Sequence, residues 1–197
     1  MRPAELEIKT SGSKLQLFFS ATASGEDCHA CPGRIGLILY KQKGESFVFE
    51  GDNGEGVEMG SWGIAPTPDN VSVMAINEKG EFAWRVDESY GNHGKIESTS
   101  VIFASISGSV DKIGKIQIGS SNSGACGPEV AEKCTELNGL LALDPEGAES
   151  EYQSLILHIF GSMKEQPFYQ RVRYSFDVKK QDYSTIDYLP EEFLAVP

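Results

Sequence analysis

Apolar residues occur in short runs along the chain, and glycine, asparagine, aspartate and serine separate the runs. In residues 15–20, leucine or phenylalanine stands at positions 15, 17 and 19, in alternation with Gln16, Phe18 and Ser20. A two-residue period of this kind is typical of a β-strand. A polar loop over residues 24–33 separates this run from the next.

Ten segments show the features of a strand, because they are short, rich in valine, isoleucine and aromatic residues, and bounded by turn-forming residues. They are residues 15–20, 34–40, 46–50, 71–76, 81–86, 100–106, 115–118, 137–143, 152–160 and 168–178. Lys43-Gly44 and residues 77–80 are turn signals, which predict hairpins between the segments on either side. In the last segment, Arg171 and Arg173 fall on one face and Val172 and Tyr174 on the other.

Helical signals are few. Residues 128–133 could form a short helix with Pro128 in its first turn, and residues 188–193 could form a single turn. The pattern therefore predicts an all-β fold, an antiparallel β-sandwich or a barrel-like sheet stack of about ten strands with little helix.

The chain has 197 residues, of which 40% are hydrophobic and 23% charged, and this composition is that of an ordinary globular protein. A chain of this length can bury enough surface for one core without a metal or disulfide staple. We expect one β-rich domain over residues 1–197, and the glycine- and serine-rich residues 119–127 are a candidate internal boundary.

The chain carries 17 lysines and arginines against 29 aspartates and glutamates, for a formal net charge of −12 and a pI near 4.7. Such a charge repels phosphate backbones and anionic lipid surfaces, so we expect no nucleic-acid partner. No apolar run approaches the length of a membrane span. The first residues lack the apolar stretch of a signal peptide, which fits a cytosolic protein or a mature domain whose leader has been removed.

Four cysteines form two local pairs in loops, Cys28 with Cys31 and Cys126 with Cys134. Paired loop cysteines favour disulfides, and disulfides favour an oxidising compartment such as a periplasm or the cell exterior. Three connectivities are possible, and the two local pairings are favoured because they close without requiring a particular fold.

The Cys28–Cys31 loop, Cys-His-Ala-Cys, also fits other chemistry. A c-type haem needs histidine directly after the second cysteine, where this chain has Pro32. Zinc would need a second ligand pair from another loop, and a thioredoxin-type redox site would need the pair at a helix N-terminus. Metal binding and thiol–disulfide exchange therefore remain alternatives to a structural disulfide.

Asp27-Cys28-His29-Ala30-Cys31 precedes an apolar strand, and Asn122-Ser123-Gly124-Ala125-Cys126 follows later. With these two motifs the chain resembles a group of uncharacterised bacterial secreted or lipoprotein-type proteins. The resemblance implies an exported protein with disulfides, and it transfers no catalytic residue.

The sequence contains no nucleophile elbow, zinc-protease motif, phosphate-binding loop or dinucleotide fingerprint, so we assign no catalytic residue, no metal site and no cofactor. The Asp52–Glu55 segment has oxygen ligands but lacks the acidic twelfth residue of a calcium loop, which favours a plain turn. His158 lies on an apolar strand and is expected in the core. The remaining candidates for ligand binding are His29, Trp62, Tyr90 and His93.

Together these features predict an exported, non-enzymatic β domain that binds a protein or a small ligand through its glycine-rich loops. A basic extracellular protein is one form of partner that the charge would favour. Two alternatives stand beside this prediction. One is a thiol–disulfide oxidoreductase or metal-binding protein that uses Cys28 and Cys31, and the other is a structural or assembly component of the cell envelope.

Overall fold

The computed structural model describes residues 2–22, 31–77, 79, 81–126, 134–147 and 152–194. The strands are β1 (Arg2–Ser11), β2 (Lys14–Thr22), β3 (Gly33–Lys43), β4 (Ser46–Asp52), β5 (Val57–Met59), β6 (Val71–Ala75), β7 (Phe82–Asn92), β8 (Lys95–Ile106), β9 (Ser109–Ser121), β10 (Thr135–Leu143), β11 (Leu155–Met163), β12 (Gln166–Asp177) and β13 (Asp182–Ser184). Two short 3₁₀ turns, η1 (Pro68–Asn70) and η2 (Ser123–Ala125), and a four-residue helix, α1 (Glu191–Leu194), complete the described part. The helix expected at residues 128–133 lies outside the described residues.

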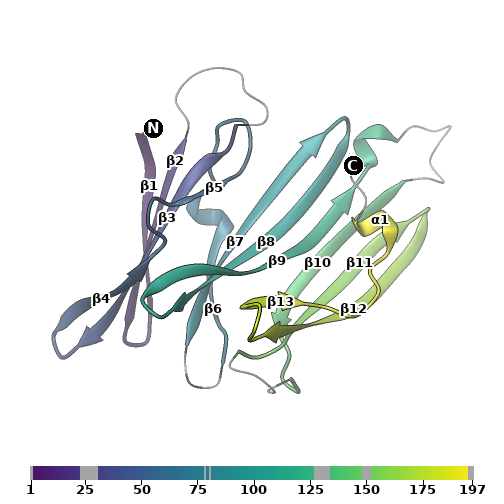
Figure 1. Ribbon diagram of the computed structural model, residues 1–197. Helices are drawn as coiled ribbons and strands as arrows, with labels where there is room; N and C mark the ends of the chain where they lie inside the picture. Colours follow the sequence, from purple (N-terminus) through teal and green to yellow (C-terminus); the bar gives the residue numbers. More distant parts are fainter. Residues whose placement is uncertain are drawn as a thin grey trace. The chain divides into compact units, whose positions relative to one another are not determined.

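The all-β fold predicted from the sequence is confirmed (Figure 1). Each of the ten predicted segments is a strand, and the described residues add β1, β5 and β13, which gives thirteen strands. One hydrogen-bonded ladder connects them as an open, mostly antiparallel sheet in the order β1-β2-β3-β4-β9-β10-β11-β12-β13. Strand β5 pairs with β3. Strand β8 pairs with β9, β7 pairs with β8, and β6 pairs with β7.

The chain divides into two compact units that share the long strands β7, β8 and β9. Unit 1 comprises residues 1–75, 79–88 and 101–113, and unit 2 comprises residues 76–78, 89–100 and 114–197. The expected single domain with a boundary near residues 119–127 stays a prediction.

Unit 1 has a core between two groups of strands. Phe18, Leu37 and Leu39 of β2 and β3 belong to one cluster of buried residues with Trp84 of β7 and Phe103 of β8. The rings of Phe18 and Trp84 lie 6.4 Å apart between centroids. The inward side of β2 and β3 therefore packs against the strands that follow residue 70, and their other side faces away from this core.

A close backbone approach joins the two groups of strands in unit 1. Asp52 of β4 pairs with Ser109 of β9 in a single parallel bridge. A Cβ atom at the neighbouring Gly51 would lie 2.8 Å from the carbonyl oxygen of Gly108. Only glycine leaves room for this contact, so Gly51 allows the sheet to continue from β4 to β9.

Unit 2 is built on the antiparallel strands β10, β11 and β12. Strand β12 alternates as predicted, because Val172, Tyr174 and Phe176 are buried while Arg171 and Arg173 are exposed. Phe176 packs edge-on against Tyr152 and Tyr183, at centroid distances of 4.6 and 5.3 Å. These rings form the aromatic part of the unit 2 interior.

Candidate functional site

The described cysteines are all in disulfides. Cys126 and Cys134 are bonded to each other, as the local pairing predicted. Cys31 is also disulfide-bonded, whereas Cys28 and His29 lie outside the described residues. A disulfide agrees with an oxidising compartment.

Trp62 stands at the tip of a tight turn in unit 1. Ser61 and Ile64 form an isolated bridge, and the N–H of Ile64 donates to the carbonyl of Ser61 at 2.9 Å. Trp62 and Gly63 both have positive φ angles, 58° and 71°, which are those of a type I′ turn. A bulky residue is rare in this conformation, yet Trp62 adopts it with half of its surface exposed.

His93 stands at a similar turn in unit 2, between β7 and β8. His93 and Gly94 have φ angles of 48° and 78°, and both residues are exposed. A Cβ atom at Gly94 would lie 2.5 Å from the carbonyl carbon of Gly124, so the turn lies directly against η2, which precedes Cys126. Tyr90, 45% exposed, lies on β7 just before this turn.

The three described candidate ligand residues, Trp62, Tyr90 and His93, are therefore exposed. Trp62 belongs to unit 1, and Tyr90 and His93 belong to unit 2. The segment Asp52–Glu55 is the turn that the sequence favoured, because the N–H of Gly54 donates to Oδ1 of Asp52 at 2.8 Å. No group of three or more metal-binding side chains occurs among the described residues.

Strand β2 has the orientation opposite to the one that its alternation would favour. Gln16, Phe18 and Ser20 are buried, with exposed fractions of 1, 0 and 2%. Leu15, Leu17 and Phe19, the more apolar set, are only half-buried on the other side. The Oε1 atom of Gln16 is buried with no hydrogen-bond partner among the described residues. Burial of an unpaired amide oxygen costs free energy. Strand β2 therefore has an unfavourable orientation, with a polar residue inside and three apolar residues on the outside.

Strand β1, at the edge of the sheet, repeats this orientation. Its outward side chains Leu6 and Ile8 are 56% and 59% exposed. Glu7 and Lys9 lie on the other side and form an ion pair at 3.5 Å, and Nζ of Lys9 donates to the carbonyl of Val71. The charged residues of β1 therefore face inward and the apolar residues face outward.

The register of β1 to β4 brings the outward apolar side chains together. Leu6 lies opposite Phe19, Ile8 opposite Leu17 and Leu17 opposite Ile38, and residues directly opposite in an antiparallel pair share a face. Tyr40 lies opposite both Leu15 and Phe49, and Gln42 lies opposite Phe47. We call this surface the outer face, and it consists of Leu6, Ile8, Leu15, Leu17, Phe19, Ile38, Tyr40, Phe47 and Phe49.

The outer face contains no charged side chain, and charges lie only at its margin. Ile38 is opposite Asp52 on β4, and Arg34 and Glu58 form an ion pair at 2.8 Å beyond Gly36. Tyr40 and Phe49 make an edge-to-face contact with ring centroids 5.9 Å apart. An apolar centre with a polar rim is the usual arrangement of a protein–protein interface.

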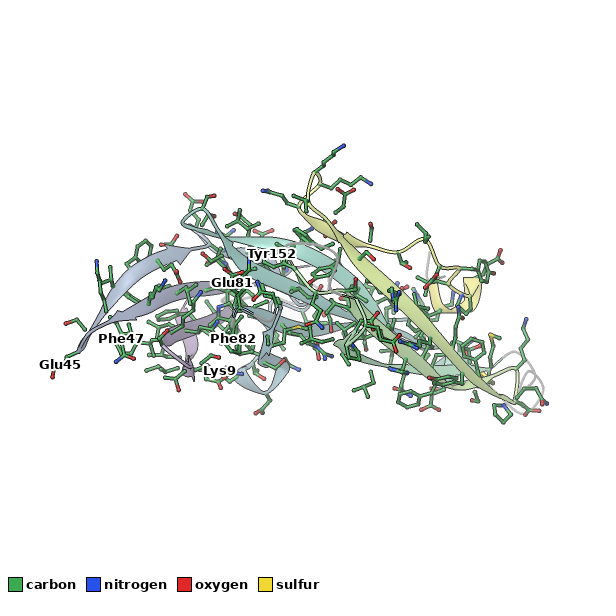
Figure 2. The ribbon with its side chains drawn as sticks, turned by 90° about the horizontal axis from the view of Figure 1, so that it is seen from below. Lys9, Glu45, Phe47, Glu81, Phe82 and Tyr152 are labelled. Carbon is green, nitrogen blue, oxygen red and sulfur yellow. A yellow bond between two sulfur atoms is a disulfide. The ribbon has the colours of Figure 1, made fainter. Side chains whose placement is uncertain are left out.

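The tip of the β3–β4 hairpin extends the outer face. Phe47 and Phe49 are 45% and 53% exposed, and Figure 2 shows Phe47 on the hairpin next to its tip at Glu45. A hollow of about 300 Å³ lies along the same hairpin, lined by Lys41, Gln42, Lys43, Val48, Phe49 and Glu50. Its volume is at the lower end of the range for small-molecule sites.

His158, which the sequence placed in the core, lies instead on the exposed side of β11. Its Nδ1 atom is 2.8 Å from the hydroxyl of Tyr169, and Tyr169 is 65% exposed. The predicted core position of His158 is therefore wrong, because its side chain is only half-buried and lies beside the exposed Tyr169. The apolar neighbours Leu157 and Ile159 point to the opposite side, where both are buried.

Asp144 is a fully buried carboxylate in unit 2 that sequence reasoning did not single out. It forms ion pairs with Arg173 and, at 3.8 Å, with Arg171, and both arginines are about half exposed. Its Oδ1 also accepts a hydrogen bond from the N–H of Glu146 at 3.1 Å. These contacts hold the turn after β10 and fix the two arginines on the surface of β12.

Comparisons of the chain with protein-family models, with curated proteins and with solved structures found no match. Among the described residues, no helix is long and apolar enough to cross a membrane.

Proposed function

We propose that this chain is an exported, non-enzymatic β protein that binds another protein chain on the outer face of β1 to β4. The observation that carries the proposal is the orientation of β2. This strand buries Gln16 and Ser20 and leaves Leu15, Leu17 and Phe19 on the outside.

Such an orientation costs stability in the isolated chain, because apolar surface stays in water while a polar side chain is buried. A partner that covers the outer face recovers the part of this cost that comes from the exposed apolar surface. Monomeric soluble proteins rarely expose contiguous apolar patches larger than a few hundred Å², and larger patches usually mark interaction sites.

The disulfides support the exported location. Cys126 and Cys134 form one bridge and Cys31 is bonded as well, and such bonds persist mainly outside the reducing cytosol. The glycine-rich turns with Trp62 and His93 remain candidate contacts for a ligand, and the outer face is the larger surface.

Site-specific photo-crosslinking in the cells that produce the protein tests the proposal. A photoreactive residue at Ile8, in the outer face, should give a discrete adduct with another polypeptide. The same residue at Ile186, which is fully exposed in unit 2, is the matched control and should give none. The substitution Phe49→Glu should abolish the adduct from Ile8, because it places a charge in the apolar face. Absence of any adduct from Ile8 would contradict the proposal.

A further inference from the structure

The geometry points to a second copy of this chain as the protein that covers the outer face. This inference rests on the proposed function and names the partner. It follows from the charge of the face, from its area and from its shape.

The charge of the outer face suits a copy of itself. The chain carries 29 acidic residues, yet none of the nine side chains of the outer face is charged. In a dimer with two-fold symmetry, each patch meets the same patch, so any charge near the axis would meet its own like charge. The apolar centre of the face avoids this repulsion, whereas a strongly basic partner would find an acidic side chain, Asp52 opposite Ile38, only at the margin.

The area agrees with a reversible dimer. Four side chains of the outer face are 45 to 59% exposed, namely Leu6, Ile8, Phe47 and Phe49. The other five are half-buried, namely Leu15, Leu17, Phe19, Ile38 and Tyr40. At about 200 Å² for a large side chain, the face presents on the order of 600 Å². Stable interfaces bury about 800 Å² on each partner, so the outer face is somewhat smaller than a typical stable interface. We expect a dimer with a dissociation constant in the micromolar range.

The shape of the face also fits a copy. The outer face is one side of four paired strands, and two sheets pack face to face at about 10 Å with interdigitated side chains. In unit 1, the inward side of β2 and β3 already packs against further strands. Two copies in face-to-face contact would bury β2 and β3 on both sides.

Light scattering coupled to size exclusion, over concentrations from about 1 μM to about 100 μM, tests the inference. The mass should rise from 21.4 kDa toward twice that value. Ile8→Glu and Phe49→Glu should each weaken the dimer at least about ten-fold, because each would bury a carboxylate at the interface. Ile186→Glu is the matched control and should leave the dimer unchanged.

Circular dichroism and thermal unfolding of each variant establish that it is folded, and Ile8→Ser provides a milder change if Ile8→Glu does not fold. A chain that stays monomeric throughout overturns the inference. A dimer that both glutamate variants leave intact overturns it as well, since the contact then lies elsewhere.

The crosslink from Ile8 separates the dimer from the proposed function. An adduct with a different polypeptide contradicts the dimer and keeps the proposed function, whereas the absence of any adduct contradicts both.

Discussion

Gln16 shows most clearly that the inward face of β2 is not the more apolar one. Its side chain is almost completely buried, and its Oε1 has no hydrogen-bond partner among the described residues. On the other side of the same strand, Leu15 and Leu17 are half-buried. The residue pattern thus favours the reverse orientation, and only Phe18, which packs near Trp84, favours the observed one.

We predict that Gln16→Met stabilises the protein. Methionine has nearly the shape of glutamine, and it removes a buried amide oxygen that lacks a partner. The free energy of unfolding should rise by about 1 kcal/mol in urea denaturation at neutral pH. Ile186→Met is a suitable control, because Ile186 is fully exposed and should tolerate the change without effect. A loss of stability in Gln16→Met would mean that the amide is needed inside the core.

The residue types of the glycine-rich loops predict exposure better than they predict which residues form a site. Glycines on both sides of His93 are typical of an exposed loop, and His93 is exposed. The aromatic character of Trp62 was equally compatible with packing, and only the turn geometry shows that half of its surface is exposed. Contacts between distant loops depend on the tertiary fold, which one sequence does not reveal.

At the scale of elements, the strands with a clear two-residue period were predictable, and the weaker ones were not. Strand β1 was not predicted, although Leu6 and Ile8 alternate with charged residues, because only these two positions carry large apolar side chains. Strands β5 and β13 have three residues each, which is too short for a period to appear. The alternation of β2 shows which side chains share a face, but the choice of the inward face depends on the strands that pack against it.

Strand β12 gives a pH-dependent prediction. Burial, together with the smaller effect of the nearby carboxylate of Asp187, raises the pKa of Tyr174 to about 12. In the unfolded chain the same hydroxyl ionises near pH 10. The folded state therefore keeps a proton that the unfolded state loses, so the stabilising effect is complete below pH 10 and is lost as the pH rises toward 12.

We predict that Tyr174→Phe reduces the loss of stability in alkali. Between pH 10 and 12, the free energy of unfolding of the variant should fall less than that of the wild type, by on the order of 1 kcal/mol. Urea denaturation at neutral pH and at two alkaline pH values measures this difference. Equal alkaline losses in both proteins would show that Tyr174 ionises as readily in the folded state as in the unfolded one.

At the scale of the whole molecule, net charge and the outer face act in opposite directions. The net charge of −12 makes two copies repel each other, whereas the uncharged outer face favours their contact. A basic partner would instead be attracted by the same charge. Salt screens both interactions, so the salt dependence of binding shows which kind of partner covers the face.

We predict that the dimer becomes stronger as sodium chloride rises from about 0.01 M to about 1 M, because the Debye length falls from about 30 Å to about 3 Å and the repulsion between copies is screened. Sedimentation equilibrium at several salt concentrations gives the dissociation constant, which should decrease. Exchange of exposed acidic residues that do not belong to the outer face should flatten the trend, and Glu165→Gln together with Glu191→Gln provides such a variant. A dissociation constant that increases with salt would indicate attraction between opposite charges, and it would contradict an association carried by the apolar outer face.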